Sequence, residues 1–590
     1  MGKKTNRNSM QWYTVDLHLH TPASSDFQQP ELSYLEILQR AEQRGLSIIA
    51  FTDHNTIAGY RKMMDDLQQL TWLEKSNRLL PEERSRLAEY NRLLNKILVL
   101  PAFEFSATFG FHILALFSPQ KPVREIEHLL LSLNIPGNQL DEGSATVGAT
   151  TDVLTAYQMI KHAGGLVIAA HANSSNGVAM RGFNFGGQTK IAYTQDINLD
   201  ALEVTDLEQK GPRTTAAFFN GTKPEYPRRM HCIQGSDCHR LSMDPARKKN
   251  LGVGDRPTDL LLSDLSFEAL KDLFTSNDFS RTRPHRHKEE PAFDYLQAAI
   301  EEGANIVQSF HDSMTIRGGK LYAIIADTCA FANTNGGTLY IGLSDEPKKQ
   351  ILGVPEVEQS MVTLEKEIAK RITPPLQCSL DIQDYKGKKL IRVLVPRGSD
   401  LPYAVDDNRI YIREEAETGL AVRDEIVNLV LRNNQLLSSQ PVPLPAATPV
   451  IAAAPEEPQK EQPPEPPSPS AKDISPRTGV EILAVDTSGD TAYYTMRDLR
   501  NGNIVNNVTQ VSARKLWQYA IHQYLEIAPQ ISQLKIQWVK DLGLVRRQKQ
   551  GNSSRFDLVQ KTPAGYRYFF GVTPDGIHGP WKQLVGEEDN

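Results

Sequence analysis

Residues 13–21 read YTVDLHLHT, an apolar run that carries one aspartate and two histidines. Side chains alternate between the two faces of a strand, so His18 and His20 are expected on the same face. Apolar runs that contain or end at histidine or acid recur at 48–56 (IIAFTDHNT), 100–106 (LPAFEFS), 111–117 (FHILALF), 166–174 (LVIAAHANS) and 232–240 (CIQGSDCHR). Helical stretches separate several of these runs, which predicts βα units around a mainly parallel sheet.

Nine side chains in or near these segments are good metal ligands. Imidazole nitrogens and carboxylate oxygens suit Zn, Mn and Fe, whereas soft copper or iron–sulfur sites favour thiolates. Six of the 14 histidines of the chain belong to this set. Histidines at the ends of buried strands indicate a metal site rather than a solvated surface. The nine residues are His18, His20, Asp26, His54, Glu104, His112, His171, Asp237 and His239.

The pattern HxHT…SD, TDH, E…H, H and SDxH, over about residues 10–280, resembles the PHP family of metal-dependent phosphoesterases. The family is named for polymerase and histidinol phosphatase. The resemblance implies a distorted (β/α)7 barrel whose site lies at the carboxyl ends of the strands. It also implies two or three divalent metal ions, either Zn, Mn or Fe. Phe27 departs from the family, which often has glycine after the motif aspartate.

Carried over by motif, the resemblance gives each of the nine residues a metal position. The first ion would be held by His18, His20, Glu104 and Asp237. Glu104 would bridge to a second ion held by His112 and His171. The third ion would be held by Asp26, His54 and His239.

The same resemblance implies hydrolysis by a water that the metal ions activate for attack on phosphorus. His54 and His239 are the candidate catalytic residues, because either could protonate the leaving oxygen if the third metal position is vacant. Asp16 and Asp53 lie next to ligand histidines and are expected to orient them. Asn173 and Arg181 are candidate phosphate-binding residues. 

A second α+β domain is predicted at about residues 293–433. AFANTNGGTLYIGLS at 330–344 and RIYIREEAET at 409–418 resemble the Schlafen-type AlbA-like domain. Members with nuclease activity carry acids where this chain has Ala304 and Ser309, so we expect binding of nucleic acid or nucleotide rather than cleavage. The candidate phosphate contacts are Arg371, Arg397 and Arg413.

The remainder of the chain divides by composition. Residues 434–477 are expected to be a disordered linker, since 12 of the 36 prolines lie between positions 441 and 476. Residues 478–586 regain strand and helix patterns and predict a small α+β domain. The formal net charge of −6 gives no general attraction to nucleic acid. No apolar run approaches the ~18 residues of a membrane span, so a soluble, cytoplasmic protein is expected.

Three functions remain open from sequence. The first is a phosphoesterase or nuclease that acts on nucleic-acid ends or nucleotides, in phage defence or regulation, with the later domains binding the substrate. The second is a small-metabolite phosphatase similar to histidinol phosphatase. The third is a non-enzymatic regulatory or sensor protein. The choice of metal, DNA against RNA, and the oligomeric state stay undetermined by sequence.

Overall fold

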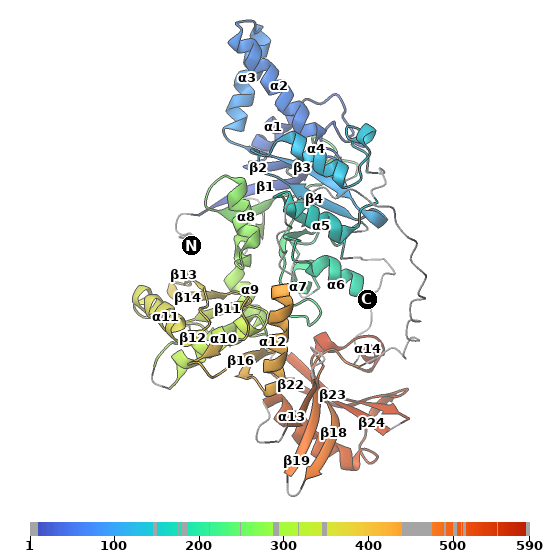
Figure 1. Cartoon of the computed structure of the whole chain (residues 1–590), viewed down its shortest axis with the longest axis vertical. Coiled ribbons are helices and arrows are strands. Elements are labelled where there is room, and N and C mark those ends of the chain that lie inside the picture. Colours follow the sequence, from blue (N-terminus) through green and yellow to red (C-terminus); the bar gives the residue numbers. More distant parts are fainter. Residues whose placement is uncertain are drawn as a thin grey trace, which may run out of the picture. The chain divides into compact units, whose positions relative to one another are not determined.

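The computed structural model describes residues 10–145, 150–174, 176–179, 187–209, 211, 213–247, 249–286, 294–316, 318–344, 351–438, 475–488, 491–499, 504–508, 510, 515–550, 553–563 and 565–585. The chain forms two compact units (Figure 1). The first comprises Met1–Leu321, Gly337–Glu365 and Gln377–Pro396, and the second comprises Tyr322–Gly336, Lys366–Leu376 and Arg397–Asn590. The sequence segment that resembles the AlbA-like domain therefore contributes to both units, and the domain boundaries expected from sequence stay predictions.

One nine-stranded sheet organises the N-terminal part of the first unit. Its order is β7-β6-β5-β4-β3-β2-β1-β8-β9. The strands are β1 (Gln11–Leu19), β2 (Ile48–Phe51), β3 (Leu98–Ser106), β4 (His112–Leu116), β5 (Leu166–Ala169), β6 (Ala201–Glu203), β7 (His231–Ile233), β8 (Thr258–Leu262) and β9 (Thr282–Pro284). Each of the first seven strands thus pairs with its neighbour in sequence.

The chain that follows β7 returns to β1 and brings the two ends of this seven-stranded run together. The Asp237 N–H donates to the His18 carbonyl at 3.0 Å, and the His20 N–H donates to the Cys238 carbonyl at 3.1 Å. The seven strands therefore curve into a nearly closed barrel, which confirms the expected fold. β8 and β9 extend the sheet as antiparallel strands next to β1.

Strand direction departs from the mainly parallel expectation at β4. This strand runs antiparallel to both β3 and β5, while β1–β2, β2–β3, β5–β6 and β6–β7 are parallel. His112 is the first residue of β4 and pairs with Ser106 near the end of β3. Because the strand is reversed, its first residue lies at the same edge as the carboxyl ends of the parallel strands.

Helices connect the strands and pack on the sheet. They are α1 (Tyr34–Gln43), α2 (Ala58–Lys75), α3 (Pro81–Leu94), α4 (Val123–Ser132), α5 (Val153–His162), α6 (Gly187–Gln195), α7 (Thr215–Phe218) and α8 (Phe267–Thr275). α8 buries Phe267, Leu270 and Leu273 in one cluster with Val15 and Leu17 of β1. This packing anchors the strand that carries His18 and His20.

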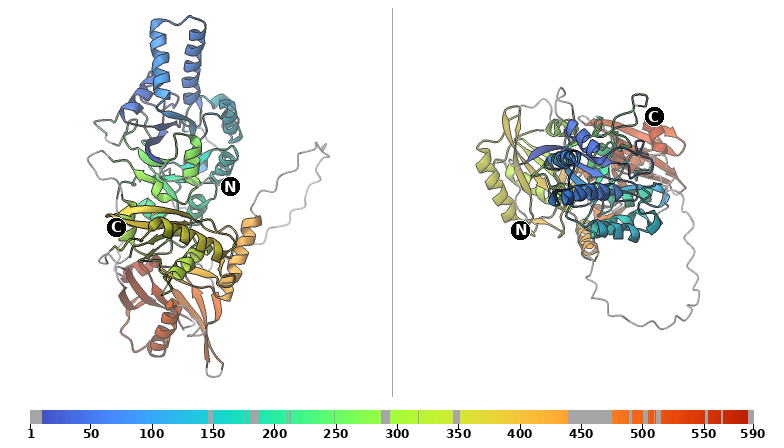
Figure 2. Two further views of the ribbon diagram at one scale, coloured as in Figure 1. Left: turned by 90° about the vertical axis from the view of Figure 1, so that its left-hand side faces the viewer. Right: turned by 90° about the horizontal axis from the view of Figure 1, so that it is seen from above.

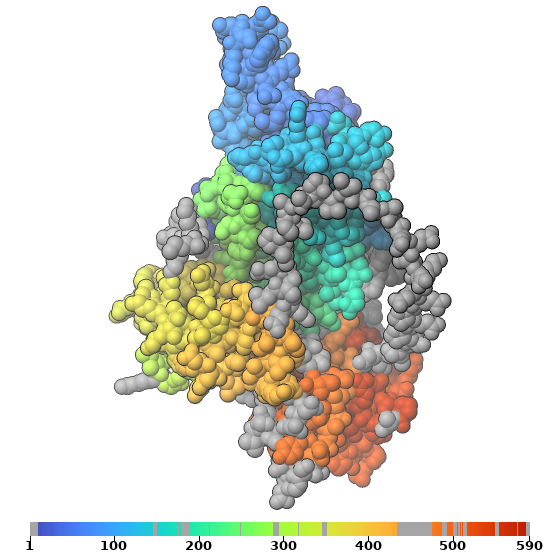
Figure 3. All heavy atoms as spheres, in the orientation of Figure 1, coloured from blue at the N-terminus to red at the C-terminus, as the bar shows by residue number. Residues whose placement is uncertain are grey.

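The charged segment after residue 60 forms a helical hairpin of α2 and α3. α2 and α3 extend side by side away from the barrel (Figures 1 and 2), and the space-filling view shows the hairpin as a separate projection (Figure 3). Pro81 is the first residue of α3, where its missing N–H costs nothing. Leu87, Tyr90 and Leu93 give α3 its buried face.

The rest of the first unit holds a four-stranded sheet of order β10-β11-β14-β13. Its elements are α9 (Tyr295–Glu302), β10 (Gln308–His311), β11 (Gly337–Ile341), β13 (Ser379–Tyr385) and β14 (Lys388–Val395). Arg392 of β14 is buried and donates to Asp278, which precedes the 3-10 turn Phe279–Arg281 and β9, at 2.8 Å. A buried ion pair therefore joins this sheet to the end of the barrel segment.

The second unit begins with α10 (Lys320–Asn333) and the C-terminal part of α11 (Val357–Arg371). Small strands follow, namely β12 (Ile372–Thr373), β15 (Ala404–Val405), β16 (Tyr411–Glu414) and β17 (Glu417–Leu420), and then α12 (Arg423–Ser438). Gly336 has φ of 72° in the turn after α10, a conformation suited to glycine. Of the linker expected at 434–477, residues 439–474 lie outside the described residues, whereas residues 434–438 belong to the last turns of α12 rather than to a linker.

The C-terminal segment forms a seven-stranded antiparallel sheet of order β20-β19-β18-β24-β23-β22-β21. Its elements are β18 (Val480–Ser488), β19 (Thr491–Asp498), β20 (Ile504–Val508), α13 (Lys515–Ile527), β21 (Gln537–Val539), β22 (Leu542–Gln550), β23 (Ser553–Thr562), β24 (Gly565–Val572) and α14 (Pro580–Val585). Trp517 of α13 and Trp581 of α14 are fully buried. The sheet with its helices confirms the expected α+β class. No helix among the described residues has the length and apolarity needed to span a membrane.

Candidate metal centre

All nine predicted ligands meet at one edge of the barrel. They come from the ends of β1, β2, β5 and β7, from within β3, from the start of β4 and from the loop after β1. In the described part of the chain, possible ligand atoms form three groups. Within each group, the atoms lie within 4.8 Å of one another. These groups are His18, His20 and Asp237; His54, Glu104 and His112; and His20, His54 and His239.

The first group lies at the buried base of the centre. The Nε2 atoms of His18 and His20 are 3.3 Å apart. Asp237 Oδ1 lies 3.3 Å from Nε2 of His18 and 3.5 Å from Nε2 of His20. Glu104 Oε1 is 3.5 Å from Nε2 of His18. The four side chains predicted to share one metal ion are therefore together.

Glu104 is the central residue of the second group. Its Oε1 lies 2.9 Å from His112 Nδ1 and 3.2 Å from His171 Nε2. Its Oε2 lies 2.9 Å from His54 Nδ1 and 3.4 Å from His20 Nε2. With His18, one carboxylate thus faces five imidazoles from four segments, the placement that a bridging ligand requires.

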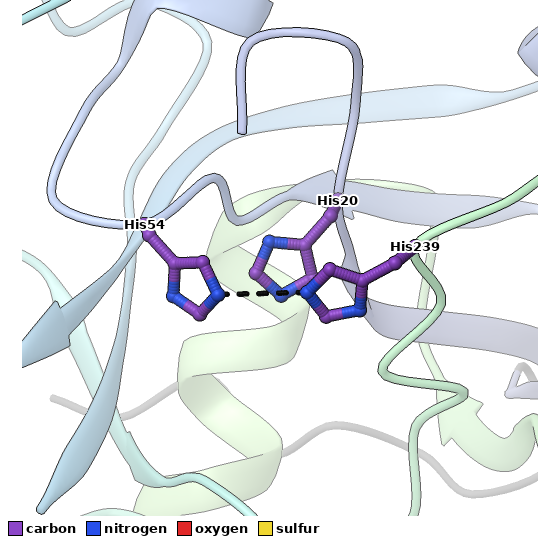
Figure 4. Close-up of side chains that lie close together, drawn as sticks. All are labelled: His20, His54 and His239. Carbon is purple, nitrogen blue, oxygen red and sulfur yellow. Dashed lines mark hydrogen bonds between the residues drawn. The ribbon is translucent and has the colours of Figure 1, made fainter. Parts of the chain in front are cut away.

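The third group forms the more open side of the centre, and Figure 4 shows its three histidines. Asp26 Oδ2 lies 3.3 Å from His54 Nε2 and 3.1 Å from His239 Nε2. The rings of His20 and His239 stack with centroids 4.0 Å apart. The side chains of Asp26 and His239 are 50% and 22% exposed, whereas those of His18, His20 and Glu104 are fully buried. A substrate would therefore approach from the side of Asp26 and His239.

The three groups share more residues than the three ligand sets that were assigned from the sequence. His54 was assigned to the third position, yet it also groups with Glu104 and His112. His20 belongs to both the first and the third group. Imidazoles that lie this close can be divided among metal positions in more than one way, so the assignment of ligands to ions stays a prediction.

The hydrogen bonds of the histidines fix which ring nitrogen faces the centre. The Nδ1–H of His18 donates to Glu203 Oε2 at 2.7 Å. Ser24 Oγ donates to Asp53, so it accepts from His20 Nδ1–H at 2.9 Å. The partner of His239 Nδ1 is the Asp237 carbonyl at 3.2 Å. In each ring the Nε2 lone pair is then directed at the other ligands, as metal coordination requires.

Several atoms of the centre are buried without a hydrogen-bond partner within the described chain. They include Nδ1 of His54, His112 and His171 and Oε2 of Glu104. Burial would raise the pKa of Glu104, but the charges of His112, His18 and His54 hold it well below its usual range. A buried, ionised carboxylate surrounded by imidazole nitrogens is a donor set that fits divalent cations, which would take the place of the histidine protons.

The backbone is strained at three residues of this edge. Asn55, His171 and Asp237 have φ of 52°, 28° and 51°, in a region that residues other than glycine rarely adopt. His171 and Asp237 are ligand candidates, and Asn55 follows His54. The strain costs on the order of 1–3 kcal/mol per residue and is a common feature of functional sites.

Asp53 and Asp16, the two acids expected to orient ligand histidines, have different hydrogen-bond partners. Asp53 accepts from Thr21 N–H at 2.7 Å and from Ser24 Oγ, so it supports His20 through Ser24. Asp16 instead accepts from the backbone N–H groups of Ser236 and Gly254, each at 3.0 Å. Its hydrogen bonds fix the chain before Asp237 and orient no ring directly.

Sequence reasoning missed Glu203, whose carboxylate contacts His18. Glu203 ends β6 and lies in LDALEVTD at 199–206, a segment without histidine. The available signal was an acid at the end of an apolar run, the pattern that had identified Glu104 and Asp237. The position of β6 between β5 and β7, which makes the contact possible, is visible only in the fold.

The candidate phosphate residues have mixed placements. Asn173 is buried, and its Oδ1 accepts from Thr205 N–H at 3.0 Å, which ties the loop after β5 to the loop after β6. Arg181 lies outside the described residues. A phosphate contact for either residue stays a prediction.

The three arginines of the AlbA-like segment differ in exposure. Arg371 pairs with Asp406, with Nε to Oδ1 at 2.8 Å. Arg413 is 4% exposed, and its guanidinium lies 4.6 Å from the Phe331 ring. Arg397 is exposed. Among the three, Arg397 offers the most accessible guanidinium to a phosphate.

Comparison with solved structures finds low identity and low overlap. The chain is similar to the lesion-specific endonuclease PfuEndoQ from Pyrococcus furiosus, at 12% identity and TM-score 0.31, covering 50% of this chain and 67% of that one. It is also similar to a two-domain protein from Bacteroides vulgatus described as containing a predicted PHP-like metal-dependent phosphoesterase, at 14% identity and TM-score 0.28, covering 48% and 68%. A third is Endonuclease Q with a 27-mer duplex that carries an abasic lesion, at 16% identity and TM-score 0.29, covering 45% and 56%.

A search of curated proteins finds no match to this chain. The family model described as Schlafen, AlbA_2 matches residues 305–421. This match covers less than half of the chain and therefore describes that segment alone. Residues 305–421 thus match the Schlafen AlbA_2 family that their sequence motifs resemble.

Proposed function

We propose that this protein is a metal-dependent phosphoesterase whose barrel hydrolyses phosphate esters of nucleic-acid ends or nucleotides. The observation that carries the proposal is the convergence of nine imidazole and carboxylate side chains at one barrel edge. Divalent ions held there would lower the pKa of a bound water and neutralise the charge of the phosphoryl oxygens.

The residues of the open side are proposed to handle the leaving group. His239 and His54 present Nε2 atoms 3.5 Å apart, with Asp26 beside both. With the third metal position vacant, a proton held on either Nε2 would lie at the accessible face of the centre, where an ester oxygen would leave. Asp26 would hold the two rings when the proton has been given up.

The AlbA-like segment is proposed to bind the substrate rather than cut it. Ala304 and Ser309 occupy the positions where nuclease members of the family carry acids, so the pair of carboxylates that would hold a catalytic metal there is missing. Arg397 supplies an exposed cation for a phosphate backbone. Nucleic acid or nucleotide is therefore the proposed ligand of this segment, and the chemistry is confined to the barrel.

Hydrolysis assays on the full chain test the proposal. Protein loaded with Mn²⁺ or Zn²⁺ is offered a 5′-phosphorylated oligonucleotide, nucleoside monophosphates and p-nitrophenyl phosphate, with and without a chelator. We expect chelator-sensitive release of phosphate or nucleotides from the nucleic-acid substrates. Turnover of p-nitrophenyl phosphate alone would instead support a small-metabolite phosphatase.

A matched pair of variants separates the centre from the rest of the chain. The double variant His18→Ala with His20→Ala removes the two imidazoles at the end of β1 and should reduce turnover to background. His128→Ala removes an exposed imidazole of α4 and should hydrolyse as the wild type does. Equal activity of the double variant and the wild type would overturn the proposal.

A further inference from the structure

Glu203 makes three contacts with two of the proposed ligand segments. Its side chain is 1% exposed at the end of β6. Oε2 accepts from His18 Nδ1–H at 2.7 Å and from the His171 backbone N–H at 3.1 Å. The carbonyl of Glu203 accepts from the Ala172 N–H at 2.6 Å. One residue thus binds the ring of His18 and two consecutive amides after β5.

We propose that Glu203 is a positioning residue that aims His18 and His171 at the metal ions. The inference rests on the metal centre of the proposed function. An ionised carboxylate can only accept, so it requires the proton of His18 on Nδ1. Nε2 then carries the lone pair that faces His20, Asp237 and Glu104.

The contact to His171 acts on the backbone instead of the ring. His171 has φ of 28°, a strained backbone conformation that persists only where other contacts stabilise it. The hydrogen bonds from the N–H groups of His171 and Ala172 to Glu203 provide that compensation. They hold the turn at which the His171 ring comes within 3.2 Å of Glu104. Glu203 therefore supports both the first and the second proposed metal position.

Oε1, the other oxygen of the Glu203 carboxylate, lies next to Gly235, where a side chain would be too close. Glu203 Oε1 is buried and has no hydrogen-bond partner within the described chain. A Cβ at Gly235 would lie 3.0 Å from this oxygen and 2.8 Å from Cβ of His18. Gly235 thus leaves the space in which the carboxylate and the ring pack together.

Calorimetric binding of Mn²⁺ or Zn²⁺ alone to metal-stripped full-length protein tests the role. Loss of a residue that orients a metal ligand typically weakens affinity ~10–100-fold, and this is the loss expected for Glu203→Ala. Glu203→Gln keeps an acceptor oxygen for His18 and should lose less. The control Glu208→Gln removes an exposed carboxylate that bonds Gln234 at 3.0 Å and should bind metal as the wild type does.

A second readout uses the unsubstituted protein, so it does not depend on the folding of a variant. Nitrogen NMR of histidine-labelled protein loaded with Zn²⁺, with His18 assigned from His18→Ala, reports which ring nitrogen carries the proton. We expect Nδ1–H. A neutral His18 protonated on Nε2, or wild-type metal affinity in both Glu203 variants, would overturn the inference. Normal hydrolysis combined with wild-type affinity in Glu203→Ala defeats this inference alone. Metal binding that depends on Glu203 without any hydrolysis defeats only the proposed function.

Discussion

Replacing Arg392 tests whether a buried ion pair holds the β10-β11-β14-β13 sheet to the barrel segment. The residue is 4% exposed, and its two Nη atoms each lie 2.8 Å from an oxygen of Asp278. Nε donates to Asp381 at 3.0 Å, and Nη1 donates to Ser280 at 2.7 Å. Arg392→Met removes the guanidinium that these two carboxylates share and fills its space with an apolar chain.

The expected loss in the free energy of unfolding follows from the burial of this ion pair. Removing one partner of a buried pair leaves carboxylates without their counter-charge and costs about 3–5 kcal/mol. Against the ~5–15 kcal/mol that stabilises a typical domain, this is a large fraction. Arg392→Lys keeps the charge but cannot make both forked contacts, so an intermediate loss is expected.

Urea unfolding and amide hydrogen exchange measure the effect. The unfolding midpoint of the first unit should fall, and exchange should rise at residues 278–284 and in β13 and β14. The matched control is Lys389→Met on the same strand, which breaks an exposed pair with Glu358. Screening by water makes such pairs weak, so no measurable change is expected there. Equal midpoints and exchange in Arg392→Met, Lys389→Met and the wild type would refute the reasoning.

Two further substitutions test the centre itself. Asp26→Ala should lower the metal content by about one ion per chain and leave the deeper positions filled. The reason is that, among the proposed ligands, Asp26 contacts the open-side rings of His54 and His239. An unchanged metal content after dialysis would exclude Asp26 as a ligand. Gly235→Ala should weaken metal binding, since the added Cβ would lie 2.8 Å from Cβ of His18 and must displace that ring. Wild-type affinity in calorimetry would contradict this, because it would mean that the ring can shift without loss of metal binding.

The sequence predicted the ligands because metal chemistry limits the residue types that can serve. His18 and His20 share a face by the period of a strand, and Asp237 and His239 repeat that spacing. The barrel follows from the same segments, since each apolar run forms a strand. These parts of the fold depend on local pattern, which the sequence shows directly.

Other parts depend on which strands become neighbours, and local pattern does not contain that information. The reversal of β4 explains why His112 stands at the start of a strand while the other ligands lie near or after the carboxyl ends of theirs. Glu203 was missed because its role comes from the placement of β6 beside β5. Arg413 was a candidate phosphate contact, and the structure buries it against Phe331. Local sequence pattern does not distinguish a buried arginine of a short strand from an exposed one.

The most direct test of the metal centre is anomalous diffraction from crystals of protein loaded with Mn²⁺ or Zn²⁺. The account predicts two or three peaks among the nine side chains, with Glu104 adjoining two of them, and nitrogen and oxygen ligands at ~2.0–2.2 Å for zinc. The absence of any peak within coordination distance of His18, Glu104 and Asp237 in metal-loaded crystals would contradict it.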